Sequence, residues 1–593
     1  MKNHKGLIKE GSIYIALFLL LCQIGCKKQE KLEEVPVTTL LQNQLVADLG
    51  TAEDYLDSIS LYPENAKDYY YQSRMLFKKT EPLLSFLDID NYTFLNQPNI
   101  LKIEEEDKTD IKMINPSGYQ VLEETLYDET ATPEEVEKHA KLTAKRLALV
   151  ADNISLDHLK EYHLLWMIRK SFVQVALTGI TGFDSPVLEN SLTEAQEVYQ
   201  SLETYLSLLK SNFTNEELYQ DWIAEIKATK EALQGEFNSF DRYYFIKEHT
   251  HAQLKLWNRT VKDWNVSFPF TLAIQNDATS LFGQDTFNKS FFAERQTGTS
   301  SPEKIALGKK LFYDTNLSTS KNISCATCHQ PELAFTDGLK ISKGLTRNSP
   351  TLLYAGLQQA FFYDKRAGSL EGQIMSVVAN EQEFHTDLET LEKTVIRDDS
   401  YQEVYKKVYG DTKVSQHQLR NAIATYIRDL APFNSKLDRN MRGEENSLSQ
   451  REINGFNVFH GKGKCATCHF PPLYNGTVPP NYKETEMELI GVPKESDTVN
   501  AVISPDLGRY YVFETEERKH FFKTPTVRNS EKTAPYMHNG VYTTLEEVVT
   551  FYKKGGGAGI GIDQPYQTLP PDPLALTAKE EEDLILFMKT LTD

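Results

Sequence analysis

The chain has 593 residues, of which 40% are hydrophobic, so it is too long for one core and indicates about three or four domains. It carries 64 Lys and Arg against 84 Asp and Glu, a formal net charge of −20. This acidity argues against nucleic acid or an anionic membrane surface as a partner. It favours a cationic protein partner, although acidity can also serve solubility alone.

The N-terminal segment predicts export. Basic residues precede an apolar run over 13–21, which is too short to span a bilayer and is typical of a secretory signal. Residues 1–26 resemble a bacterial lipoprotein signal with Cys26 as the lipidated first mature residue, and plain cleavage is the alternative. We expect a polar tether over 27–50 and a periplasmic or cell-envelope protein anchored to a bacterial membrane.

Residues 51–250 show helical patterning throughout. Thr132, Pro133 and Glu135 supply an N-cap, a proline at N1 and a capping-box glutamate, and Ala140 and Leu147 follow on one face. We predict an up-and-down helical bundle here, followed by an irregular, aromatic-rich connector over 251–292. No strand pattern is evident.

Two stretches of this region resemble the imelysin-like helical family, one at 74–82 and one at 118–123. The second is similar to that family's Gly-x-His-x-x-Glu signature, whose His and Glu are candidate metal ligands. Here Gln120 stands in place of the His, with Glu123 at the Glu position. Because glutamine is a poor metal ligand, we interpret this region as a structural bundle.

One short motif occurs twice. A C-x-x-C-H sequence is the signature of covalent c-type haem attachment, in which two thiols form thioethers and the adjacent imidazole becomes the proximal iron ligand. Half of a zinc knuckle or a redox disulfide is the alternative interpretation of a CxxC pair, but the His in both copies favours haem. The two copies are Cys325, Cys328, His329 and Cys465, Cys468, His469.

Helical patterns flank these motifs. Capping signals at Ser301 and Ser449 start a helix before each motif, and Thr577 starts a closing helix at the C-terminus. A cytochrome c domain needs such helices to wall its haem. We therefore predict an all-α fold, with the N-terminal bundle followed by two c-type cytochrome domains, 293–440 and 441–593.

The residues around the two motifs resemble the dihaem cytochrome c peroxidase and MauG-like family, over residues 286–593. The shared stretches are Phe-Thr-Asp-Gly at 335–338, Arg-Asn-Ser-Pro-Thr at 347–351, Phe-Tyr-Asp-Lys-Arg-Ala at 362–367, Thr-Val-Arg-Asn at 526–529 and Ala-Pro-Tyr-Met-His-Asn-Gly at 534–540. The resemblance implies that the first haem is the peroxide site and that the second stores or relays electrons.

At the first haem, the resemblance implies that Glu383 is the acid–base group that moves a proton between the peroxide oxygens, with Glu381 as the neighbouring fallback. It implies that Gln373 lines the same pocket. Many members have a His that caps this haem, but residues 330–346 contain none, and His385 reads as a local loop residue. We therefore predict a first haem that is open without reductive activation.

Between the haems, Tyr363 takes the place of the family's usual Trp relay, and a tyrosine must lose a proton to carry an electron hole cheaply. The resemblance implies Tyr552 as the distal ligand of the second haem, as in MauG-like members, with Met537 as the alternative soft ligand. It also implies one calcium ion between the domains, bound by Asn348 and by the backbone carbonyls of Thr533 and Pro535. The implied cofactors are thus two haems and one calcium ion.

These features predict a dihaem c-type peroxidase that reduces hydrogen peroxide to water. Its electrons would come from a small cytochrome c or cupredoxin and arrive through the second haem. One alternative is a MauG-like oxidase that uses peroxide to oxidise an organic or protein substrate. The other is a non-catalytic dihaem electron carrier. We expect no nucleic-acid partner, and contact with the membrane only through the lipid on Cys26.

Overall fold

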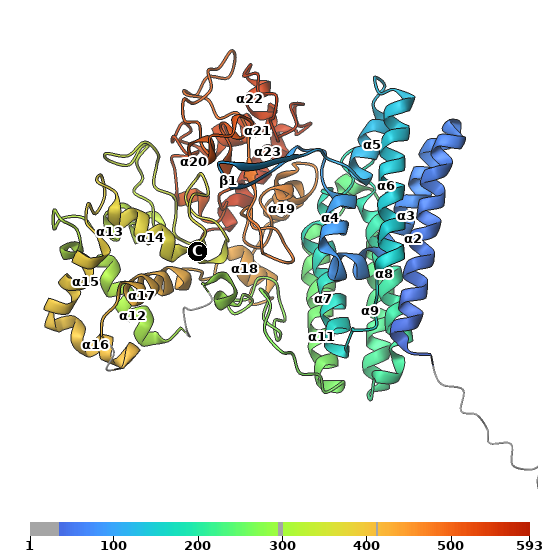
Figure 1. Ribbon diagram of the computed structural model, residues 1–593, viewed down its shortest axis with the longest axis horizontal. Helices are drawn as coiled ribbons and strands as arrows, with labels where there is room; N and C mark the ends of the chain where they lie inside the picture. The colour runs from blue at the N-terminus through green and yellow to red at the C-terminus, as the bar shows by residue number, and fades with distance from the viewer. Residues whose placement is uncertain (1–34, 295–299, 411–412) are drawn as a thin grey trace, which may run out of the picture.

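The computed structural model describes residues 35–294, 300–410 and 413–593. The predicted signal segment with Cys26 lies outside these residues. Helices dominate the described chain and form the bundle at the right of Figure 1, the region of the first CxxCH motif at the left, and the region of the second motif between and above them. In the described part of the chain, every helix is too short or too polar to cross a bilayer.

The bundle is built from long helices that run side by side (Figure 1). The predicted capping box opens α6, because Thr132 Oγ1 accepts from Glu135 N at 3.3 Å while Glu135 Oε2 accepts from Thr132 N at 2.8 Å. Shorter pieces, α4 (Ile89–Asn96), α5 (Tyr119–Tyr127), α10 (Arg242–Tyr244) and η5 (Phe245–Thr250), connect them. The long helices are α2 (Val37–Leu61), α3 (Ala66–Leu87), α6 (Pro133–Asn153), α7 (Glu161–Leu177), α8 (Ser191–Leu208), α9 (Glu216–Ala232) and α11 (His251–Asp263).

Two predicted boundaries of the bundle were wrong. The expected tether is helical from residue 37 onward, because Leu41, Leu45 and Leu49 recur every four residues and are buried along α2. The expected connector is irregular only after residue 263, because Leu254 and Trp257 give α11 a buried face. In both places a periodic apolar stripe determines that the segment is helical, whereas the prediction depended on its polar or aromatic composition.

The expectation that the chain has no strands was also wrong. β1 (Lys102–Asp107) and β2 (Asp110–Ile114) form an antiparallel hairpin with Ile103 opposite Met113. The hairpin leaves the bundle between α4 and α5 and lies across the second motif region, as β1 shows in Figure 1. A shorter ladder joins β3 (Met487–Glu488) to β4 (Phe522–Lys523) in that region.

The same helix crossing walls both motif regions. The helix before each motif meets the closing helix of its region at a glycine: a Cβ on Gly308 would lie 2.0 Å from the carbonyl oxygen of Ala422, and one on Gly455 would lie 1.9 Å from that of Asp583. Only glycine lets the two backbones approach this closely. The crossing pairs are α12 (Pro302–Tyr313) with α17 (Gln416–Asp429), and α19 (Gln450–His460) with α23 (Ala578–Thr590).

The remaining helices complete the two regions. In the first they are α13 (Cys325–Cys328), α14 (Leu370–Ala379), α15 (Leu388–Arg397) and α16 (Asp399–Tyr409), and α18 (Lys436–Met441) leads into the second. In the second they are α20 (Tyr510–Phe513), α21 (Leu545–Lys553) and α22 (Gly556–Gly559). The predicted all-α architecture of a bundle and two motif regions is therefore confirmed, apart from the two small ladders.

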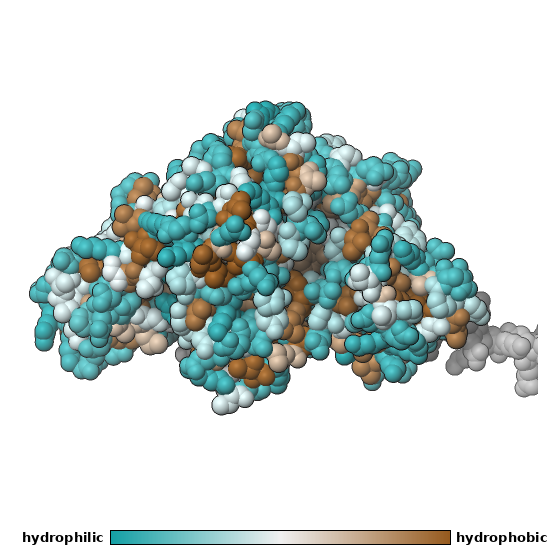
Figure 2. All heavy atoms as spheres, turned by 90° about the horizontal axis from the view of Figure 1, so that it is seen from above, coloured by the Kyte–Doolittle hydropathy of each residue, from teal (hydrophilic) through white to brown (hydrophobic). Residues whose placement is uncertain are grey.

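The hydrophobic core joins the bundle to the second motif region. One continuous set of buried side chains runs from the bundle helices into α19 and α23, whereas the first motif region has a core of its own. Phe183 and Phe470 meet with ring centroids 6.1 Å apart, and Tyr243 and Phe456 meet at 5.6 Å. Hydrophilic atoms cover most of the face seen in Figure 2, with apolar atoms in separate patches.

Candidate haem and peroxide site

The first CxxCH motif forms one short helical turn. The amide of His329 donates to Cys325 O at 3.0 Å, which folds the ring back beside the two cysteines. Nδ1 of His329 lies 2.9 Å from Phe335 O, so it carries the proton and leaves Nε2 with the lone pair that a metal needs. Ser349, from the Arg-Asn-Ser-Pro stretch, donates to Cys328 O at 3.0 Å and fixes the turn.

The second motif repeats this arrangement. Cys465 opens η10 (Cys465–Thr467), and the amide of His469 donates to Cys465 O at 2.9 Å. Nδ1 of His469 lies 3.0 Å from Pro525 O, so Nε2 again keeps its lone pair. Burial lowers the pKa of His469 to about 4, and burial also lowers the pKa of His329. Both imidazoles are therefore neutral at pH 7, as an iron ligand must be.

These residues fit two c-type haems. The thiols of both CxxC pairs are free rather than bridged, and each adjacent imidazole has one nitrogen fixed by a carbonyl and one available. Across the described ranges, no group of three or more His, Cys, Asp and Glu side chains is placed to hold a metal ion. That finding gives no support to the zinc-knuckle alternative.

Glu383 lies beside the first motif. It is half-buried in a turn that follows α14, and its Oε2 accepts from Asn380 Nδ2 at 2.7 Å. Burial raises the pKa of its carboxyl above the usual range, while Asn380 and the more distant Arg366 oppose the shift. Burial raises the pKa of Cys325 and Cys328, and the negative charge of Glu383 adds to this, for Cys328 after that of Asp337.

The neighbouring candidates are arranged differently. Gln373 is half-buried on α14, upstream of the turn, and no hydrogen bond among the described residues joins its side chain to Glu383. Glu381 and His385 are exposed. The backbone of the turn is fixed by Thr319, whose amide donates to Phe384 O at 3.0 Å and whose hydroxyl donates to His385 O. Of the two glutamates in this turn, Glu383 is thus the one that is half-buried and held by Asn380.

Tyr363 connects the two motif regions through a short chain of hydrogen bonds. Its hydroxyl donates to Asn348 Oδ1, Asn348 Nδ2 donates to Pro535 O at 3.0 Å, and Asn348 N donates to His538 O at 3.0 Å. Burial raises the pKa of Tyr363 well above its usual value. Since an amide oxygen is not a base, the phenolic proton of Tyr363 has no ready acceptor here.

The residues predicted for calcium lie close together but are engaged with one another. Asn348 Oδ1 accepts a hydrogen bond from Tyr363, and Pro535 O accepts one from Asn348. Thr533, two residues before Pro535, directly follows the short η12 turn (Ser530–Lys532). Calcium prefers six to eight oxygen ligands, often including carboxylates. With Asn348 Oδ1 and Pro535 O both accepting hydrogen bonds, the set does not fit the ion without exchanging these bonds.

Both candidate ligands of the second haem pack against one apolar cluster. Tyr552, on α21, and Met537, which has a φ of +70° in the turn after Tyr536, lie against buried Val541 and Phe551. Burial raises the pKa of the Tyr552 hydroxyl, and the neighbouring thiols of the second motif raise it further. Tyr552 and Met537 thus share one apolar environment, and the choice between the two ligands stays open.

An ion-pair network beside Tyr363 escaped the sequence analysis. Arg347 donates to Asp506 from Nε at 2.6 Å and from Nη2 at 2.8 Å, and from Nη1 to Asp364 at 2.7 Å. The forked guanidinium thereby ties the first motif region to the second. Arg347 belongs to a recognisable motif, but Asp506, which lies 159 residues away, stands in no motif.

Comparisons with known proteins agree with this arrangement. A family model described as di-haem cytochrome c peroxidase matches residues 302–446. A cytochrome-c peroxidase of Pseudomonas sp. (strain SCT) is 34% identical over 313 residues, covering 49% of this chain and 81% of that protein. The cytochrome c551 peroxidase of Nitrosomonas europaea is 37% identical over 248 residues, covering 41% and 70%.

MauG proteins are also similar to this chain. The methylamine utilization protein MauG of Methylorubrum extorquens is 30% identical over 297 residues, covering 49% of this chain and 78% of that protein. Among solved structures, a MauG-like protein associated with microbial copper homeostasis is 28% identical, with a TM-score of 0.46, covering 51% of this chain and 92% of that one. The relatives named here match about half of this chain.

Proposed function

Because the chain belongs to the di-haem cytochrome c peroxidase and MauG family, we propose that it is a peroxidase that reduces hydrogen peroxide to water. The reaction consumes one peroxide, two protons and two electrons and yields two waters. The family implies two c-type haems, and the first, when bound, supplies the redox centre at which peroxide reacts. The observation that carries the proposal is the half-buried Glu383, oriented by Asn380 in a turn that Thr319, just before the first motif, fixes.

In this proposal Glu383 moves the proton. Its carboxylate would take a proton from one peroxide oxygen and deliver it to the other, which would then leave as water. Asn380 fixes one carboxylate oxygen at 2.7 Å and leaves the other free to reach the substrate. His329 supplies the proximal imidazole, with its Nδ1 proton held by Phe335 O.

Electrons would enter at the second haem and pass beside Tyr363. The hydroxyl of Tyr363 is bound to the amide oxygen of Asn348, and Arg347 places a positive charge nearby. Both features disfavour a lasting hole on this ring. They support passage of electrons to peroxide over storage of oxidising equivalents for an organic substrate.

The MauG-like oxidase remains the second candidate because one observation favours it. Tyr552 lies close enough to the second motif for both thiols to affect its pKa, and a phenolate ligand would lower the reduction potential of that haem. Such a ligand favours high oxidation states at the second haem.

The test is turnover with hydrogen peroxide and a reduced small cytochrome c or cupredoxin, compared with turnover of organic donors. Peroxide-dependent oxidation of the protein donor is the expected result. Glu383→Gln should keep both haems attached and slow the peroxide step by about 10²-fold or more, whereas Glu381→Gln should leave it unchanged. Rapid oxidation of organic donors with an idle protein donor would favour the oxidase instead.

Two further parts of the proposal concern calcium and location. Calcium would bind Asn348 Oδ1 and the carbonyls of Thr533 and Pro535 once the hydrogen bond from Tyr363 is exchanged, and metal analysis before and after chelation tests this.

The protein would act outside the cytoplasmic membrane, anchored by lipid on Cys26. Loss of the lipid mass in Cys26→Ser would support the anchor.

A further inference from the structure

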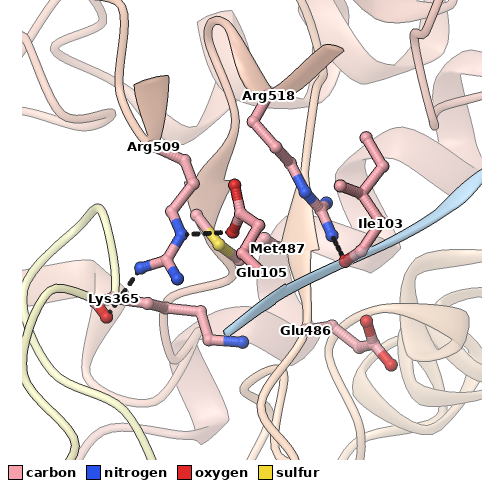
Figure 3. A pocket seen from close by; sticks show the side chains of 7 residues that line it. All are labelled: Ile103, Glu105, Lys365, Glu486, Met487, Arg509 and Arg518. Carbon is pink, nitrogen blue, oxygen red and sulfur yellow. Dashed lines mark hydrogen bonds and ion pairs between the residues drawn. The ribbon is translucent and has the colours of Figure 1, made fainter. Parts of the chain in front are cut away.

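The β1–β2 hairpin of the bundle borders a polar cavity of about 210 Å³ at the second motif region (Figure 3). Glu105 reaches into it from β1 and accepts from Arg509 Nε at 2.8 Å. The two side chains are only 5% and 11% exposed, so this is a buried ion pair. Arg518 donates from Nη2 to Ile103 O at 2.7 Å and holds the strand itself.

Arg509 also grips the segment that follows Tyr363. Its Nη1 donates to the backbone carbonyls of Asp364 and Lys365, both at 2.9 Å. Figure 3 shows the guanidinium between Glu105 on one side and the Lys365 backbone on the other. One side chain therefore joins the hairpin, the second motif region and the stretch between the two haem motifs.

Two further ties of this stretch also come from the second motif region, whereas Asn348 and Arg347 hold the Tyr363 hydroxyl and the Asp364 carboxylate from the first motif region. Lys523 N donates to Tyr363 O at 2.7 Å, and Lys365 Nζ donates to Thr485 O at 2.6 Å. Lys523 and Lys365 each donate one of these hydrogen bonds, whereas Arg509 donates to two successive backbone carbonyls. Its orientation depends on Glu105, because a guanidinium without a carboxylate on Nε can rotate away.

We infer that the hairpin is part of the electron-transfer unit and that Glu105 is a positioning residue for Tyr363. Through Arg509, Glu105 holds the 363–365 backbone at a fixed place between the two haem motifs. The inference rests on the proposed passage of electrons beside Tyr363, and it gives the N-terminal region a role in that passage.

The first test is hydrogen exchange of the peptide covering 361–367 in the holoprotein. Glu105→Gln keeps the shape of the side chain and removes its charge, and we expect exchange of this peptide to rise about tenfold. The matched control is Glu104→Gln on the same strand, whose side chain is 41% exposed and pairs with Lys102 at 3.0 Å. It should leave the exchange unchanged.

The second test separates electron transfer from peroxide chemistry. Stopped-flow mixing of the peroxide-oxidised protein with a reduced donor should show transfer from the second haem to the first about tenfold slower in Glu105→Gln. The rate at which peroxide reacts with the first haem should not change. The double variant Glu105→Gln/Arg509→Lys should be no slower than Arg509→Lys alone, because both changes break one link.

Unchanged exchange in Glu105→Gln would overturn the inference, and so would a looser peptide with unchanged transfer. Equal slowing of transfer and of the peroxide reaction would also overturn it, because it would indicate general damage. If Glu105→Gln does not fold, the same two measurements, hydrogen exchange of residues 361–367 and electron transfer between the haems, are made on Arg509→Lys, which keeps the charge. Absence of electron transfer between the haems of the wild-type protein would refute the proposed function. The hydrogen-exchange test would still show whether the hairpin fixes residues 361–367.

Discussion

At Glu383, burial and hydrogen bonding act on the pKa in opposite directions, and burial prevails. The pKa therefore lies above the usual value of a glutamate, and the carboxylate needed as a base is lost as pH falls through it. We expect the peroxide rate to fall at a higher pH than an exposed glutamate would give. Asn380→Ala removes a bond that lowers the pKa, so it should move this inflection to still higher pH in a pH–rate profile.

The matched control for this prediction is Glu381→Gln, which changes an exposed carboxyl in the same turn. Its profile should overlay that of the wild type. An inflection that follows Glu381 rather than Asn380 would remove Glu383 from the proton transfer.

The second haem gives a prediction at Tyr552. Exchange of a phenolate for a thioether raises the reduction potential of a haem, because the softer ligand favours the reduced iron. Tyr552→Met should therefore raise the potential of the second haem and change its spectrum, while Met537→Leu should change neither. If potentiometry gives the opposite pattern, Met537 is the ligand.

The sequence singled out candidate site residues but not the residues that hold them. Glu383, Tyr363 and Tyr552 stand at positions that the family resemblance marks as candidates. Asn380 and Asp506 were missed because a short amide or carboxylate acquires a role only from the partner that the fold brings to it. Asp506, which pairs with Arg347, could be found only in three dimensions.

At the scale of elements, the two helix crossings depend on glycine. Gly455→Ala would force a Cβ to within 1.9 Å of a backbone carbonyl oxygen, which neither helix can relieve without moving. We expect a loss of at least about 2 kcal/mol in the free energy of unfolding. Denaturant titration of the holoprotein measures it.

Gly50 supplies the comparison for this substitution. It lies within α2 with no atom near enough to meet an added Cβ. Gly50→Ala should stabilise the protein by about 0.5–1 kcal/mol, because alanine loses less backbone entropy in a helix. Equal effects of the two substitutions would show that the crossing at Gly455 is loosely packed.

Helices were predictable because their signals are local. The capping boxes at Thr132, Ser449 and Thr577 start α6, α19 and α23 as expected. The hairpin was not predictable, because β1 is rich in glutamate, which disfavours strands. It is held against the second motif region by Arg509, 404 residues from Glu105 in sequence, and by Arg518.

At the scale of the molecule, the shared core makes the bundle and the second motif region one unit. A chain reduced to residues 286–593 would expose the faces of Phe456 and Phe470 that the bundle covers. We expect this fragment to bind an apolar dye and to aggregate, as size-exclusion chromatography would show. A chain in which a short Gly-Ser loop replaces only residues 102–114 should stay monodisperse with both haems attached.

A soluble, dye-silent fragment with an unaltered second haem would contradict the shared core. The sequence could not predict that the bundle and the second motif region share a core, because an apolar stripe on a helix does not identify the surface against which it packs. The bundle itself was predicted, but its attachment to the second rather than the first motif region required the contacts of Phe183 and Tyr243.

The shared core has a consequence for biogenesis. Phe183 and Tyr243 are translated long before Phe456 and Phe470. The nascent bundle therefore exposes an apolar surface until the second motif region has been translated. A holding chaperone would have to shield that face during this interval. Haem attachment at Cys465 and Cys468 would then come late in maturation, since α23, which completes the second motif region, is the last helix to be made.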